Sequence, residues 1–86
     1  MKSLIFSIYD TATETFMTPI FCKTEAEALR AFNDASNNPD NPIGAHPADY
    51  HLYKVGEFTD HNGDLRNQAP ECIISAIECT QKHKET

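Results

Sequence analysis

The densest set of side chains that could do chemistry lies between residues 46 and 61. It holds five potential metal ligands, namely His46, Asp49, His51, Asp60 and His61. A zinc site needs three or four ligands that converge on one point. If residues 49–58 form a strand, the first and last of these ligands lie beyond opposite ends of it, because a strand rises ~3.3 Å per residue. Convergence is poor, so the sequence predicts no metal site and no cofactor.

Catalytic patterns are also missing. Serines, cysteines and histidines occur, but none of them stands in a Gly-flanked nucleophile turn. The three glycines, at positions 44, 56 and 63, are too scattered for a phosphate-binding loop. The paired carboxylates Glu25 and Glu27 are explained by the start of a helix. We therefore expect a protein that is not an enzyme.

Aromatic and basic residues leave one further chemistry, the binding of nucleic acid. Strand aromatics stack bases where cations flank them, and Tyr53 with Lys54 and Arg66 could form such a set. The chain carries seven basic and thirteen acidic residues, a net charge of -6. This balance opposes nonspecific attraction to nucleic acid or anionic lipid. On residue types alone, a core or an oligomer interface accounts for these aromatics better than base stacking does.

The cysteines indicate a reducing environment. Cys22, Cys72 and Cys79 cannot all pair with one another, and their spacing fits no zinc pattern. We expect free thiols in a cytoplasm. No stretch approaches the ~20 apolar residues of a membrane span, and the N-terminal apolar run is too short for a signal peptide.

One helix is predicted after residue 24. Thr24 and Glu27 have the spacing of a capping box, and early acidic residues suit the positive end of a helix. One apolar face follows at helical spacing, made of Ala28, Leu29, Phe32 and Ala35. The helix should end near Ser36, because residues 37–42 are turn formers with two prolines.

Five strands are predicted around this helix, over residues 2–9, 16–21, 49–58, 64–68 and 73–77. Pro19 assigns the second strand to an edge or marks a bulge, and Gly56 marks a bulge in the third. Residues 60–63 form the turn to the fourth strand, which Pro70 should end. Residues 1–80 then make one domain, and residues 81–86 read as a frayed tail.

Residues 37–47 are expected to be a loop without structure of its own. Such a loop is at the upper end of what compact domains carry. It is either a mobile or partner-contacting element, or a plain crossover that returns the chain to the sheet.

The predicted fold is α+β, a mainly antiparallel sheet of four to five strands with one helix on one face, in the order β-β-α-β-β-β. The third strand should lie beside the first, with the Pro19 strand at the edge. One helix covers one face, yet several strands are apolar on both. The second face is buried either by curling into a partial barrel or by another copy of the chain, and we favour a dimer. Its interface would include Ile5, Tyr9, Tyr53 and Val55.

The combined motifs resemble a known family. They are SIYD, F-x-x-P-I-F-C, A-L-R-A-F-N-D, an N-x-P loop and, above all, H-P-A-D-Y-H-L-Y-K-V-G-E-F-T-D. Over about residues 3–64 the chain is similar to the small nonstructural protein of microviruses, the gokushovirus-type single-stranded-DNA phages. The C-terminal third carries no matching motif.

The resemblance implies a phage protein made in the host bacterial cytoplasm. Members are described as DNA-binding or replication-associated, acting at the switch from duplex replication to single-strand synthesis and packaging. The family supplies no catalytic residues. Two functions are therefore expected. One is a replication accessory that engages single-stranded DNA or a viral or host replication protein. The other is a protein-interaction module, an inhibitor or adaptor of a host factor, that binds no nucleic acid.

Overall fold

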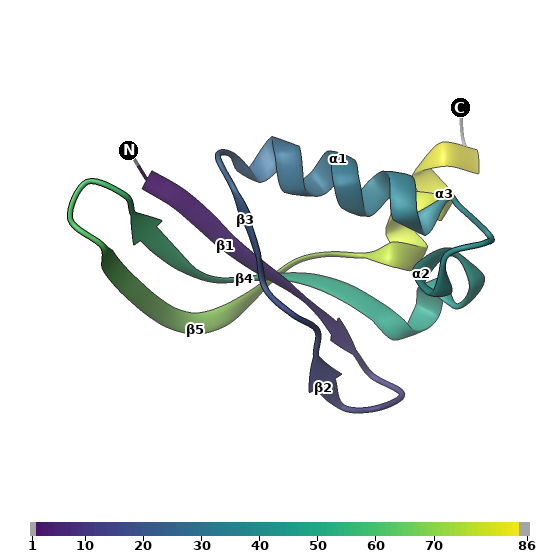
Figure 1. Ribbon diagram of the computed structural model, residues 1–86. Coiled ribbons are helices and arrows are strands. Elements are labelled where there is room, and N and C mark those ends of the chain that lie inside the picture. The colour runs from purple at the N-terminus through teal and green to yellow at the C-terminus, as the bar shows by residue number, and fades with distance from the viewer. Residues whose placement is uncertain (1, 85–86) are drawn as a thin grey trace.

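The computed structural model describes residues 2–84 of the chain, and the side chains of residues 2–80. Its elements follow one another as β1 (Lys2–Asp10), β2 (Thr15–Phe16), β3 (Ile20–Cys22), α1 (Glu25–Ser36), α2 (Pro42–Ala45), a 3-10 turn (Pro47–Asp49), β4 (Tyr50–Thr59), β5 (Asp64–Ser75) and α3 (Ala76–Lys84). Figure 1 shows α1 lying over one side of the sheet, with α2 and α3 gathered at one end of it. The β4–β5 hairpin curls past the other end of α1.

The sheet is antiparallel throughout and has β1 near its centre. The order is β2-β1-β4-β5, and β3 also pairs with β1. The expected α+β class, the antiparallel sheet of four to five strands and the place of the strand over residues 49–58 beside the first are confirmed. The expected order β-β-α-β-β-β is wrong, because the elements run β-β-β-α-α-β-β-α. Pro19 lies in the break between β2 and β3, at the edge, because it has no N–H to give to the ladder.

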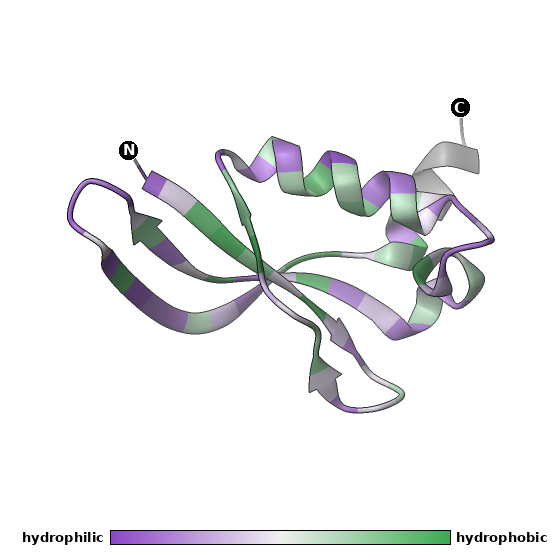
Figure 2. Ribbon diagram, in the orientation of Figure 1, coloured by the Kyte–Doolittle hydropathy of each residue, from purple (hydrophilic) through white to green (hydrophobic). Residues whose placement is uncertain are grey.

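The helix α1 begins and ends as the sequence predicts. The backbone N–H of Glu27 donates to Thr24 Oγ1 over 3.2 Å, which is one half of the capping box. The Glu27 carboxylate accepts from the N–H of Lys23 at 2.7 Å, one residue before the cap. The apolar face of α1 packs on Phe6 and Leu52, which are fully buried. Figure 2 shows apolar residues along the middle of β1, where this core forms, and a hydrophilic turn between β4 and β5.

The C-terminal third differs from the prediction. Residues 64–75 form one long strand, so the separate fourth and fifth strands are wrong, and residues 76–77 belong to α3. Pro70 does not end the strand. Lys54 pairs with Glu71 and Gly56 with Asn67, so residues 68–70 bulge opposite a single residue and the missing N–H of Pro70 costs no ladder bond.

Helix α3 (Ala76–Lys84) extends into the stretch that was expected to be a frayed tail. Its backbone continues through Lys84, into the predicted tail of residues 81–86, whose last two residues lie outside the described part. Ala76 and Cys79 of this helix are buried in the core. The expectation of a single helix is therefore wrong. A second long helix, α3, packs its buried residues into the core beside α1.

The stretch 37–47 is structured, contrary to expectation. Asn41 caps α2 by accepting from the N–H of Ile43 at 2.9 Å, and Pro42 occupies the first helical position, where its lack of an N–H is harmless. Ile43 is buried in the core. Gly44 packs so closely that an added Cβ would lie 2.0 Å from the carbonyl oxygen of Asn38. This segment is part of the packed fold.

The predicted bulge near Gly56 is confirmed and shapes the sheet. The β1–β4 pairing moves from Ile5 opposite Gly56 to Phe6 opposite Lys54, which leaves Val55 as the extra residue. The β4–β5 pairing also shifts between Lys54 and Gly56. Bulges increase local twist, and Figure 1 shows the β4–β5 hairpin curling beyond this point.

Candidate functional site

The face of the sheet turned away from α1 is the candidate site, and we call it the open face. Directly paired residues of antiparallel strands share a face, so the register defines this surface. Because Leu4, Phe6 and Ile8 pack on the helical core, their neighbours along β1 point the other way. The open face consists of Ser3, Ile5, Ser7, Tyr9, Phe16, Phe21, His51, Tyr53, Val55, Phe58, Leu65, Asn67 and Cys72.

The open face carries large exposed apolar side chains. The exposed fractions are 44% for Phe16, 57% for Phe21 and 65% for Leu65. Ile20, the neighbour of Phe21 on β3, pairs with Phe6 and so faces the helical side. Ser7 adds no polar demand, because its hydroxyl donates to the carbonyl of Met17 at 2.7 Å. A monomer gains nothing from leaving such a surface in water.

The same surface is poor in charge, and Arg66 is the one charged residue among the described residues that line its groove. Within the described strands, no Asp, Glu, Lys or Arg occupies a paired position of the open face. The charged residues of β4 and β5 instead pair toward the helical side, as Glu57 does with Leu4 and Glu71 with Lys54. Depletion of charge is the compositional mark of an interface core.

An aromatic cluster occupies one end of the open face. Tyr9, Phe16 and Tyr53 contact one another, with ring centroids 4.8 Å apart for Tyr9–Phe16, 5.3 Å for Phe16–Tyr53 and 6.0 Å for Tyr9–Tyr53. Tilted and edge-on pairs of this kind are favourable. The pKa of Tyr53 is raised, and burial is the largest cause. Cys72, which is paired with Tyr53 across the strands, and Tyr9 raise it further. The Tyr53 phenol is thus held in its neutral form.

An apolar groove occupies the other end. It has a volume of about 440 Å³ and is lined by Ile5, Pro19, Phe21, Val55, Leu65, Arg66 and Asn67. Ile5, only 7% exposed, lies deep in it, and Phe21 and Leu65 stand as its exposed walls. The ring of Phe21 rests edge-on against Phe58, with centroids 5.9 Å apart, which fixes one wall.

The four residues predicted for an oligomer interface all lie on the open face. Tyr9 and Tyr53 belong to the aromatic cluster, and Ile5 and Val55 line the groove. Sequence reasoning missed Phe16, Phe21 and Leu65, which are more exposed than those four. Only the pairing register reveals that these three share one face, because they come from three different strands.

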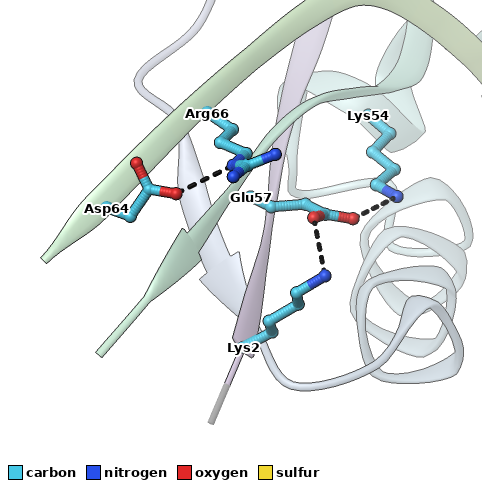
Figure 3. Close-up of polar contacts among 5 residues, drawn as sticks. All are labelled: Lys2, Lys54, Glu57, Asp64 and Arg66. Carbon is cyan, nitrogen blue, oxygen red and sulfur yellow. Dashed lines mark hydrogen bonds and ion pairs between the residues drawn. The ribbon is translucent and has the colours of Figure 1, made fainter. Parts of the chain in front are cut away.

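The three residues predicted to bind nucleic acid are not brought together. Tyr53 is on the open face, whereas Lys54 and Arg66 pair with Phe6 and Glu57, at positions of the other side. Arg66 also lines the apolar groove, at the end of the open face away from the aromatic cluster of Tyr53. Both cations also have acidic partners, as Figure 3 shows. Lys54 Nζ lies 3.5 Å from Glu57 Oε2, and Arg66 Nε lies 2.8 Å from Asp64 Oδ2.

These ion pairs shift the proton affinities of their members. Lys2 lies 3.5 Å from the second carboxylate oxygen of Glu57 and, ahead of Lys54, lowers the pKa of that carboxyl. The hydrogen bond from Arg66 to Asp64 raises the pKa of the guanidinium. Surface pairs like these contribute little to stability, but they engage both cations that were predicted to bind nucleic acid.

The part of the chain that the structure describes offers little other chemistry. No three His, Cys, Asp or Glu residues there are placed to hold a metal ion. Cys22 is buried and Cys72 exposed, both as free thiols, and burial raises the pKa of Cys22. None of the described helices is long and apolar enough to cross a membrane.

Comparison with known proteins gives one match. The family model described as "Phage ORF5 protein" matches residues 3–79, most of the chain, including residues 65–79, which the motifs did not cover. No curated protein and no solved structure matches.

Proposed function

The chain belongs to the phage ORF5 protein family, and from this premise we propose that it is a non-catalytic accessory protein of a microvirus-type phage that works through protein contacts of its open face. The process it assists is viral single-stranded-DNA replication, or the switch from replication to genome packaging, in the host bacterial cytoplasm. Support for the process comes from the resemblance of residues 3–64 to the microvirus nonstructural protein.

One observation carries the choice of protein contacts. The open face combines exposed Phe16, Phe21 and Leu65 with the absence of charge at its paired positions. Nucleic acid draws affinity from cations that displace counterions from phosphates, and a face without Lys supplies little of it. Apolar and aromatic side chains are what the centre of a protein interface uses.

The experiment uses two neighbouring positions of one strand. Phe21→Asp places a charge on the open face, and Ile20→Asp places the same charge at a position 40% exposed on the opposite face. In cells infected with phage carrying each variant, the ratio of viral single-stranded to duplex DNA is measured by hybridisation. We expect the ratio to fall with Phe21→Asp and to stay at the wild-type value with Ile20→Asp. Equal ratios in all three would reject the proposal.

Direct binding of single-stranded DNA is the second candidate, and the aromatic cluster favours it. Tyr9, Phe16 and Tyr53 offer ring faces and edges of the kind on which bases stack. Anisotropy of a labelled oligonucleotide at two salt concentrations decides this point. Binding at micromolar protein that weakens with salt would establish this candidate, whereas a flat titration would remove it.

A host factor is the other protein target that the open face could serve. In that case the chain inhibits or adapts a host protein without acting on viral replication. The open-face variant would then lower phage yield while the ratio of viral DNA forms stays unchanged, which separates the two roles.

A further inference from the structure

We propose that the open face binds a second copy of this chain, with the aromatic cluster of each copy seated over the apolar groove of the other. The inference rests on the proposed function, because it names the first partner of the same face. It assigns a role to both ends of that face and to the residues that line them.

The charge distribution permits a second copy as the occupant. Each chain carries a net charge of -6, so two copies repel each other overall, and this repulsion is smallest where the contact brings no like charges together. The paired positions of the open face meet this condition within residues 2–80, and Arg66 only lines the groove. Contact there buries no carboxylate and leaves no ion without its partner.

The size of the apolar surface fits a dimer. Phe16, Phe21 and Leu65 alone expose on the order of 300 Å² of apolar surface, since a large side chain presents ~200 Å² when free. A stable interface removes ~800 Å² per partner. Four half-buried residues add further apolar area to this patch, namely Tyr9, Tyr53, Val55 and Phe58. The molecule measures 42 × 29 × 20 Å, so its broad side has room for an interface of that size.

The positions of the two features give the symmetry. Tyr9 of the cluster and Ile5 of the groove lie four residues apart on β1, about 13 Å along the strand. A two-fold axis that lies in the interface and crosses β1 near Ser7 exchanges these two ends. The exposed ring of Phe16 in one copy then stands over the groove between Phe21 and Leu65 in the other. Such a contact is self-complementary and closes as a dimer.

Two opposite charges test this pairing. Phe16→Glu changes the cluster and Leu65→Lys changes a wall of the groove. Each variant alone should weaken the dimer about tenfold or more, measured as the dissociation constant by sedimentation velocity. The double variant places opposite charges against each other at both contacts, so its dissociation constant should return most of the way to the wild-type value. Ile20→Glu, similarly exposed but on the opposite face, is the control and should leave the constant unchanged.

Several results would overturn the inference. They are a wild-type chain that stays monomeric at ~100 μM, single variants that dimerise like the wild type, and a double variant no tighter than the weaker single one. Circular dichroism checks that each variant is folded, and the uncharged changes Phe16→Ser and Leu65→Ser repeat the test where a charged one unfolds. A monomeric wild type would reject only the second copy, because the accessory role has its own readout in the viral DNA forms.

Discussion

Replacement of Gly56 by alanine tests the close approach of β4 and β5 beside the apolar groove. A Cβ at Gly56 would lie 2.4 Å from the carbonyl oxygen of Arg66 and 3.5 Å from the Cα of Asn67. An ordinary C···O contact is about 1 Å longer than the first of these distances. The obstacle is backbone, so β5 must move away from β4 and break ladder bonds at the bulge. Overpacking of this kind costs about 1–3 kcal/mol.

The assay is thermal unfolding followed by circular dichroism. In a domain of this size, 1 kcal/mol shifts Tm by about 4–8 °C, so a cost of about 2 kcal/mol lowers Tm by about 8–16 °C. Protein concentration is kept low and equal, because association itself raises Tm. Gly63→Ala is the control. The φ of +74° at position 63 should lower the free energy of unfolding by about 1 kcal/mol when alanine occupies it, but no atom lies within 4 Å of the new Cβ. A Gly56→Ala variant as stable as the wild type would refute the close approach of β4 and β5.

Four further outcomes follow from the core packing, the helix cap, the ion pairs of Glu57 and the burial of Tyr53. Leu52→Ala, at a fully buried core position, should lose about 2–5 kcal/mol in urea unfolding, and Thr24→Ala about 1 kcal/mol through the lost cap. Because the pKa of Glu57 is lowered, chiefly by Lys2, its ion pairs stabilise the fold above the unfolded value of about 4.5 and this contribution disappears as pH falls. Lys2→Ala should therefore flatten the decline of Tm in acid. The pKa of Tyr53 is raised, so its contribution is complete below pH 10 and is lost as pH rises further, and spectrophotometric titration should show that phenol ionising late.

Local signals in the sequence were sufficient for β1, α1 and β4, but not for α2 or for the break between β2 and β3. The capping box at Thr24 and the alternation of apolar residues in β1 each act over a few residues and are read directly from the chain. The bulge at Gly56 was also predictable, because a glycine inside a strand pattern marks a place where another backbone approaches.

The errors have physical causes, and part of the signal was present. Ser75 and Glu78 have the same spacing as Thr24 and Glu27, and the N–H of Glu78 does donate to Ser75 Oγ, so a helix start was readable there. Asn41 before Pro42 is likewise the start of a short helix. Apolar periodicity over residues 73–77 is too short to distinguish a strand from a buried helix, and packing on the core decided it.

The residues that make up the open face can be identified only from the strand pairing in the structure. Its existence was inferred from strands that are apolar on both sides, but its membership depends on register shifts between Ile5 and Phe6 and between Lys54 and Gly56. A shift of one residue changes which side chains share a face. The grouping of Tyr53 with Lys54 and Arg66 fails for a simpler reason, because Tyr53 and Lys54 are neighbours on one strand and therefore point to opposite faces.

The solution mass of the chain, measured by light scattering at ~100 μM beside the Phe21→Asp and Ile20→Asp variants, tests the open face as an association surface most directly. We expect a dimer for the wild type and for Ile20→Asp, and a monomer for Phe21→Asp, with all three folded. A wild-type monomer, or a dimer that persists in Phe21→Asp, would contradict self-association through this face.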